Sequence, residues 1–186
     1  SMLKIHAGID IDVWQKALQK ISATYSILRT EIHSCDTSYA DSAYQCVRST
    51  HSIAFEYRDL TELSLSNNEQ TSYIRNLVQN PYNFNKGPLV RHYLLLIEPE
   101  FYIAVFSAHQ IVLDRLSVCD YLSRTCEIYF KLVQNLEIPD QAPDTYAEYV
   151  EFCCSSFDTQ KSMKFWQNRL TDVEPLDMHR PATNTS

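Results

Sequence analysis

The stretch Ser107-Ala108-His109-Gln110-Ile111-Val112-Leu113-Asp114-Arg115-Leu116-Ser117 separates two segments with different hydrophobic periodicity. Residues 101–106, which precede it, are apolar enough for a buried strand, whereas residues 116–133 have the spacing of an amphipathic helix. His109 and Asp114 therefore lie where a buried strand ends and a helix begins. Such a pair is either part of a functional site or a structural lock for the turn, and the residues alone leave both interpretations open.

Strand and helix patterns alternate along the rest of the chain. Alternation and strand-forming composition predict strands over residues 3–9, 28–33, 39–47 and 53–57, and the apolar runs 89–97 and 101–108 predict two adjacent strands, the second buried on both faces near its end. Helical spacing predicts helices that begin after an N-cap at Asp10 and that cover residues 60–80, 116–133, 146–153 and 162–170. This alternation predicts a layered α/β fold. Side chains expected in its core include Cys119, Cys126, Tyr146, Tyr149, Phe152, Phe165 and Trp166.

Composition excludes several classes of function. The chain is 45% hydrophobic and has a net charge of −7, without a clustered basic face, so nucleic acid is not an expected partner. No apolar run approaches the ~20 residues that span a bilayer. Only two glycines occur, which excludes a glycine-rich phosphate loop. The six cysteines form no C-x-x-C pair and the histidines are scattered, so we expect no metal site, reduced thiols and a cytoplasmic location.

Several short motifs occur in series along the chain. Leu28-Arg29-Thr30 reads LRT, and residues 82–91 read YNFNKGPLVR. Residues 109–115 read HQIVLDR, Tyr146-Ala147-Glu148-Tyr149 follows, and residues 165–170 read FWQNRL. Together with the opening strand-to-helix element around Ile9-Asp10, these resemble, in order and spacing, the core motifs of the condensation domains of nonribosomal peptide synthetases, within the chloramphenicol-acetyltransferase-like superfamily.

The resemblance implies a fold and a place in a larger domain. It predicts a chloramphenicol-acetyltransferase-like layered sandwich, with a mixed sheet flanked by helices, that forms one lobe of a two-lobed domain. We expect residues 3–172 to be the N-terminal lobe and residues 173–186 to be a flexible tail or the start of the inter-lobe linker. An apolar face should be exposed where the C-terminal lobe docks, with potential self-association of the isolated chain.

The motif HHxxxDG of the family aligns with residues 109–115, and this chain departs from it. Gln110 stands in place of the second histidine, which carries catalysis in active relatives, and Arg115 replaces the glycine. The family's usual Arg-His before LRT is Thr24-Tyr25 here. Because an amide cannot act as a general base, canonical activity is expected to be impaired or absent. The related heterocyclisation motif DxxxxDxxS fits only Asp114 and Ser117, since His109 stands where its first aspartate belongs.

The site predicted by the resemblance therefore comprises the motif positions His109, Gln110 and Asp114. His109 is expected to bond to the backbone as a structural residue, and Asp114 is expected to form a bidentate ion pair with Arg29. The implied function is amide or ester bond formation between acyl groups carried on phosphopantetheine, which a partner peptidyl or acyl carrier protein delivers. The alternative is a non-catalytic module that docks a carrier protein or a neighbouring domain. No directly bound cofactor or metal is expected.

Overall fold

The computed structural model describes residues 1–34, 43–49, 53–139, 146–156 and 158–173. The chain divides into two compact units, Ser1–Asp144 and Thr145–Ser186, and each unit is described by itself. The predicted tail from residue 174 onward and residues 39–42 of a predicted strand lie outside the described residues.

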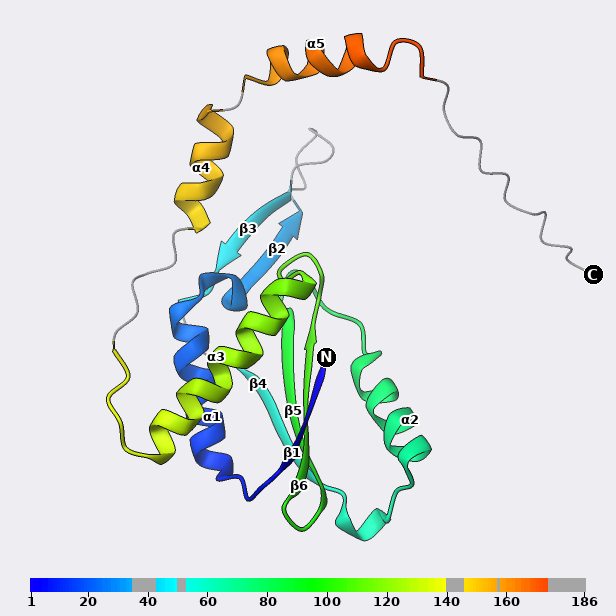
Figure 1. The fold of residues 1–186 in the computed structure, drawn as a ribbon, viewed down its shortest axis with the longest axis vertical. Helices are drawn as coiled ribbons and strands as arrows, with labels where there is room; N and C mark the ends of the chain where they lie inside the picture. Colours follow the sequence, from blue (N-terminus) through cyan, green and yellow to red (C-terminus); the bar gives the residue numbers. More distant parts are fainter. Residues whose placement is uncertain (35–42, 50–52, 140–145, 157, 174–186) are drawn as a thin grey trace, which may run out of the picture. The chain divides into compact units, whose positions relative to one another are not determined.

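The first unit contains the strands and three α-helices (Figure 1). Its strands are β1 (Met2–His6), β2 (Thr30–Ser34), β3 (Ala43–Val47), β4 (Ala54–Asp59), β5 (Val90–Glu98) and β6 (Phe101–Ala108). Its helices are α1 (Ile11–Thr24), α2 (Asn67–Val78) and α3 (Arg115–Val133), with 3-10 turns η1 (Ser26–Arg29) and η2 (Thr61–Leu63). The second unit contains α4 (Tyr146–Ser156) and α5 (Thr159–Arg169).

A mixed sheet lies at the centre of the first unit. Its strand order is β1-β6-β5-β4, in which β6 is antiparallel to β1 and β5, and β4 is parallel to β5. Helices α1 and α3 lie side by side over one face of this sheet, and α2 covers the other (Figure 1). Strands β2 and β3 form a separate antiparallel pair. The predicted mixed sheet flanked by helices is confirmed.

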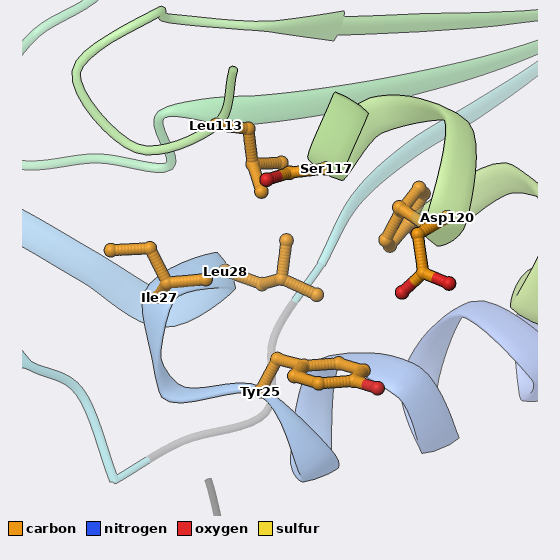
Figure 2. A pocket seen from close by; sticks show the side chains of 7 residues that line it. Tyr25, Ile27, Leu28, Leu113, Ser117 and Asp120 are labelled. Atoms are coloured by element: carbon orange, nitrogen blue, oxygen red, sulfur yellow. The ribbon is translucent and has the colours of Figure 1, made fainter. Parts of the chain in front are cut away.

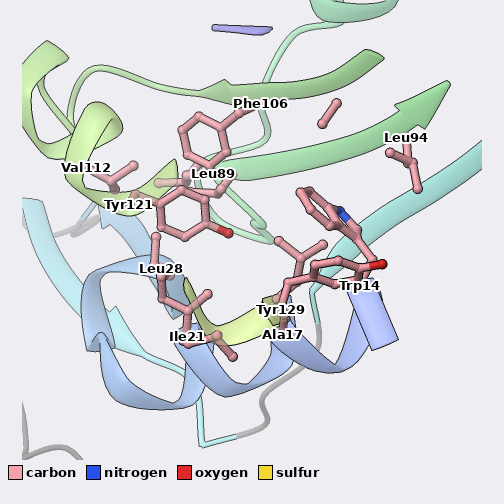
Figure 3. Close-up of a cluster of buried hydrophobic side chains, with 14 residues drawn as sticks. Trp14, Ala17, Ile21, Leu28, Leu89, Leu94, Phe106, Val112, Tyr121 and Tyr129 are labelled. Carbon is pink, nitrogen blue, oxygen red and sulfur yellow. The ribbon is translucent and has the colours of Figure 1, made fainter. Parts of the chain in front are cut away.

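Alternation along β5 and β6 builds two cores on opposite faces of the sheet. Leu94 and Phe106 pack with α1 and α3 (Figure 3), whereas Leu95 and Val105, one residue away from each, pack with Leu77 of α2. Successive strand side chains point to opposite faces, so helices on both faces bury both sets. The near-continuous apolar runs in these two strands therefore follow from their central position in the sheet.

Helix α1 begins as predicted. The Asp10 carboxylate accepts a hydrogen bond from the Val13 amide at 3.0 Å, which satisfies one of the free amides of the first turn. Trp14 and Ala17 then face the core with the other apolar residues of the helix. The Asp10 amide in turn donates to the hydroxyl of Tyr129 on α3 at 3.1 Å, so the start of α1 is tied to α3.

Two predicted elements begin later than expected. The predicted strand 28–33 starts with the 3-10 turn η1, and β2 begins only at Thr30. The predicted helix 60–80 is divided, because Ser64 adopts a left-handed conformation (φ 46°) after η2. Ser66 and Glu69 then form a capping box that starts α2. The hydrogen bond of a capping serine side chain to the backbone competes with the hydrogen bonds of a continuous helix, so a new helix starts at this position.

The prediction of core side chains was wrong for several residues. Cys119 is exposed on α3, because the buried stripe of this helix runs through Tyr121, Thr125, Ile128 and Tyr129, whereas Cys126 is half-buried and packs against the core. In the second unit no described residue of α4 or α5 is buried. The aromatic residues predicted for the core are exposed there: Tyr146, Tyr149, Phe152, Phe165 and Trp166. Two helices of this length supply too little apolar surface to enclose a core of their own.

The five described cysteines have free thiols. Among the described residues, no cluster of three or more histidine, cysteine, aspartate or glutamate side chains is arranged to hold a metal ion. In the same part of the chain, no helix is both long and apolar enough to cross a membrane.

Candidate functional site

The predicted motif forms the turn between β6 and α3. Strand β6 ends at Ala108, and α3 begins at Arg115. The His109 amide donates to the Leu89 carbonyl at 2.9 Å, just before β5, and the His109 carbonyl accepts from the Val112 amide at 3.1 Å. The backbone of His109 is therefore held from both sides, on one end of the sheet.

The imidazole of His109 is half-buried and is also bound to the backbone. Its Nδ1 accepts a hydrogen bond from the Ile111 amide at 3.1 Å. Because a backbone amide only donates, Nδ1 carries no hydrogen, and the ring hydrogen lies on Nε2. The rings of Tyr82 and Phe84 contact the imidazole edge-on, with centroids 5.8 and 4.8 Å away. Both come from the segment of residues 82–91, which resembles one of the core motifs of the family.

Gln110 and its neighbours form the exposed part of the turn. The side chain of Gln110 is exposed, and Arg115, in place of the motif glycine, is exposed at the start of α3. Two large apolar side chains flank them: Ile111 is 52% exposed and Leu116 is 79% exposed. The exposed surface of the turn therefore combines the amide of Gln110 and the guanidinium of Arg115 with the apolar side chains of Ile111 and Leu116.

Asp114 is the N-cap of α3. Its carboxylate accepts a hydrogen bond from the Ser117 amide at 2.7 Å. This backbone hydrogen bond is the main cause that lowers the pKa of Asp114 below its usual value. The carboxylate is thus held in the charged form, where it stabilises the first turn of the helix.

The ion pair predicted between Asp114 and Arg29 is not formed. Arg29 donates from Nε to the Ser22 carbonyl at 2.9 Å and from its terminal nitrogen to the Arg48 carbonyl. The ion pairs among the described residues include Glu31 with Arg48 and Asp120 with Arg124, but not this pair. Arg29 lies in η1, where its guanidinium donates to two backbone carbonyls. The Asp114 carboxylate instead accepts a hydrogen bond from an amide of α3. Asp114 is exposed.

A cavity of about 190 Å³ lies beside the motif, between the end of α1 and the start of α3. Leu28 points across it towards Leu113 and Ser117, with the ring of Tyr25 below and Asp120 at one side (Figure 2). Tyr25 stands where the family usually has histidine. The lining is mainly apolar, and its polar residues include Ser117 and Asp120.

Sequence reasoning missed a buried polar pair, His92 and Tyr121. His92 Nδ1 lies 3.2 Å from the Ala54 carbonyl and therefore donates to it, and Nε2 accepts from the Tyr121 hydroxyl at 2.6 Å. Burial lowers the pKa of His92 to about 4 and raises that of Tyr121. A search of the sequence for histidines at metal-ligand spacing does not detect this pair. The position of His92 within the apolar run of β5 was the available signal, since a buried histidine requires partners.

The turn offers hydrogen-bonding groups but no free base. His109 has a hydrogen on Nε2 and an engaged acceptor at Nδ1, and Asp114 is committed to the helix cap. Gln110 donates and accepts hydrogen bonds but does not titrate. The motif residues lie in one turn between β6 and α3, and their arrangement suits orientation of a bound group better than proton abstraction.

Comparison with known proteins identifies the family. The model of the Condensation domain family matches residues 1–185. The chain is 25% identical over 193 residues to a linear gramicidin synthase protein of Brevibacillus parabrevis, an alignment that covers 97% of this chain and 2% of that protein. It is also 22% identical over 177 residues to tyrocidine synthase 3 of the same organism, covering 91% of this chain and 3% of that protein. The chain thus spans only a small part of these relatives.

Solved structures show the same fold at lower identity. The starter condensation domain of the rhizomide synthetase RzmA is 18% identical with a TM-score of 0.79, over 93% of this chain and 42% of that one. The first condensation domain of the CDA synthetase is 18% identical with a TM-score of 0.73, over 94% of this chain and 43% of that one. The predicted chloramphenicol-acetyltransferase-like fold and the family resemblance are confirmed, and the chain belongs to the condensation domain family of nonribosomal peptide synthetases.

Proposed function

We propose that this chain forms the N-terminal lobe of a condensation domain whose acyl-transfer site keeps its frame but lacks its general base. The reaction of such a site joins acyl or aminoacyl groups held as phosphopantetheine thioesters on carrier proteins, by an amide or ester bond. The match over about two fifths of the solved condensation domains supports the assignment to one lobe.

The observation that carries this proposal is the geometry of the turn 109–114. His109 is held by its backbone and ring, and Asp114 caps α3, so the residues that shape the turn are in place. The exposed position between them carries Gln110. Loss of a general base typically costs ~10²–10⁴ in rate, and positioning alone leaves slow turnover. The proposed consequence is impaired rather than altered chemistry.

The test is Gln110→His in the full-length synthetase, with product formation measured from loaded carrier proteins. We expect the variant to form product ~10²–10⁴ times faster than the native protein, since histidine titrates near working pH. Gln110→Leu is the matched control, because it fills the same exposed position without a base. If the native protein already turns over as fast as the histidine variant, the proposal of an impaired site is wrong.

A docking function without chemistry is the second candidate. It is favoured by the exposed apolar side chains Ile111 and Leu116 beside the motif, which suit contact with another protein surface. Product formation by the Gln110→His variant separates the candidates, with carrier binding measured alongside by calorimetry. A docking module binds the carrier equally well in the native form and in the Gln110→His variant, and neither protein forms product. The C-terminal lobe is a further expected partner of this face.

A further inference from the structure

The imidazole of His109 is enclosed by residues that come from a single distant segment. Tyr82 and Phe84 place their rings edge-on to it, at interplanar angles of 80° and 78°. Edge-to-face contacts at these separations are favourable and directional. The Phe84 carbonyl also accepts from the Ile32 amide at 3.0 Å, which ties this segment to β2. The rings therefore rest on a fixed backbone.

Tyr82 is itself held in place by Arg91 of β5. The guanidinium of Arg91 stacks over the Tyr82 ring at 4.2 Å. It also donates to the carbonyls of Asn80 and Pro81, both at 2.7 Å, which immediately precede Tyr82. The Tyr82 hydroxyl is bonded to the Ser107 hydroxyl at 2.6 Å, two residues before His109. Stacking and paired hydrogen bonds together restrict the ring more than either contact alone.

We propose that Arg91 is a positioning residue for His109 and acts through the ring of Tyr82. Arg91 fixes the backbone and ring of Tyr82, and Tyr82 and Phe84 fix the imidazole in the orientation in which Nδ1 accepts from Ile111. The Nε2 hydrogen is then held in one direction. Among the described residues, Nε2 has no hydrogen-bond partner, so it remains a donor for a bound group.

This inference rests on the proposed function, because it assigns a role to the motif histidine of that site. It adds that Nε2–H of His109 is presented as a fixed hydrogen-bond donor beside Gln110, and that the arginine of the segment 82–91 controls it. An oriented donor needs no reorganisation when charge develops on a nearby carbonyl oxygen, which is how such groups assist acyl transfer.

The test is ¹⁵N nuclear magnetic resonance of the histidine rings in the 186-residue chain, with the His109 signals assigned from their loss in His109→Gln. In the native chain we expect a single tautomer with hydrogen on Nε2. Arg91→Met should lose this single signature and give averaged Nδ1 and Nε2 signals. Arg58→Met is the matched control, since Arg58 similarly contacts Tyr73, by a 2.7 Å hydrogen bond, without any contact to His109.

Three further variants test the contacts of Tyr82 and Phe84 with His109. Tyr82→Phe retains the ring and should preserve the signature, whereas Tyr82→Leu should lose it. If Arg91→Met unfolds the chain, Phe84→Ala tests the same enclosure from the other side. An unchanged His109 signature in folded Arg91→Met, or equal loss in Arg58→Met, would overturn the positioning role. Neither outcome depends on whether Gln110→His changes turnover, so this inference and the proposed function fail separately.

Discussion

Replacement of His92 by glutamine should flatten the dependence of stability on pH. His92 is buried between β4, β6 and α3, where it bonds to Ala54 and Tyr121, and burial lowers its pKa to about 4. In the unfolded chain its pKa is near 6.5. Between these two values the unfolded state binds more protons than the folded state. The free energy of unfolding therefore falls as pH falls through this window.

The size of the effect follows from the gap between the two pKa values. A gap of roughly 2.5 corresponds to ~3 kcal/mol once the pH is below both values, and ~2 kcal/mol of this is already lost at pH 5. Above pH 7 the contribution of His92 is complete. The native chain should therefore lose ~2 kcal/mol more than His92→Gln between pH 7.5 and pH 5, which is about 4–8 °C in the midpoint of thermal unfolding.

The assay is chemical unfolding followed by circular dichroism at several pH values, for the native chain and for His92→Gln. Comparing the slopes removes the contribution of carboxylates, which both proteins share, and any constant loss from the changed hydrogen bonds. Tyr121→Phe is the control, since it deletes the hydroxyl that bonds His92 but leaves the histidine buried, so the native slope should persist. Equal slopes for the native chain and His92→Gln would refute the assignment of a neutral, buried His92.

Other substitutions test the packing and the turn. Leu94 is 0% exposed, so Leu94→Ala should lower the free energy of unfolding by ~2–5 kcal/mol, whereas Leu63→Ala, at a side chain 57% exposed, should change it by less than ~0.5 kcal/mol. Gly87 has φ +51°, and a Cβ there would lie 3.4 Å from the Glu31 side chain, so Gly87→Ala should cost ~1–2 kcal/mol in denaturant unfolding. Asp114→Ala should lower the melting temperature, whereas Asp114→Asn, which keeps an acceptor for the helix amide, should lower it less; equal losses would contradict the capping role.

Much of the candidate site could be located from sequence, but not its partners. The motif around His109 was placed correctly between a buried strand and a helix. The expected ion pair of Asp114 with Arg29 was wrong. An acidic residue directly before a helix accepts hydrogen bonds from the amides of the first helical turn, which are closer to it than a distant arginine. At Asp10 the same rule predicted a cap, and the structure confirms it. Both aspartates therefore cap a helix, and at Asp114 the cap takes the place of the predicted ion pair.

The features that the sequence predicts by itself are those that depend on interactions between residues close together in the chain. The apolar runs of β5 and β6, the cap at Asp10 and the helical spacing of α1 and α3 each depend on residues a few positions apart. These elements establish the layered α/β class and place the turn 109–114 at the end of a buried strand. The replacement of the motif histidine by Gln110 is likewise visible in the sequence alone.

Only the tertiary structure decided which distant residues meet. The rings of Tyr82 and Phe84 reach His109 from a segment far back in the chain, and His92 finds Tyr121 from a different element. Such contacts depend on how the sheet and helices close over one another, and periodicity carries no information about that closure. A partner for a polar side chain is therefore set by the packing of whole elements, whereas the existence of the elements is set by their own residues.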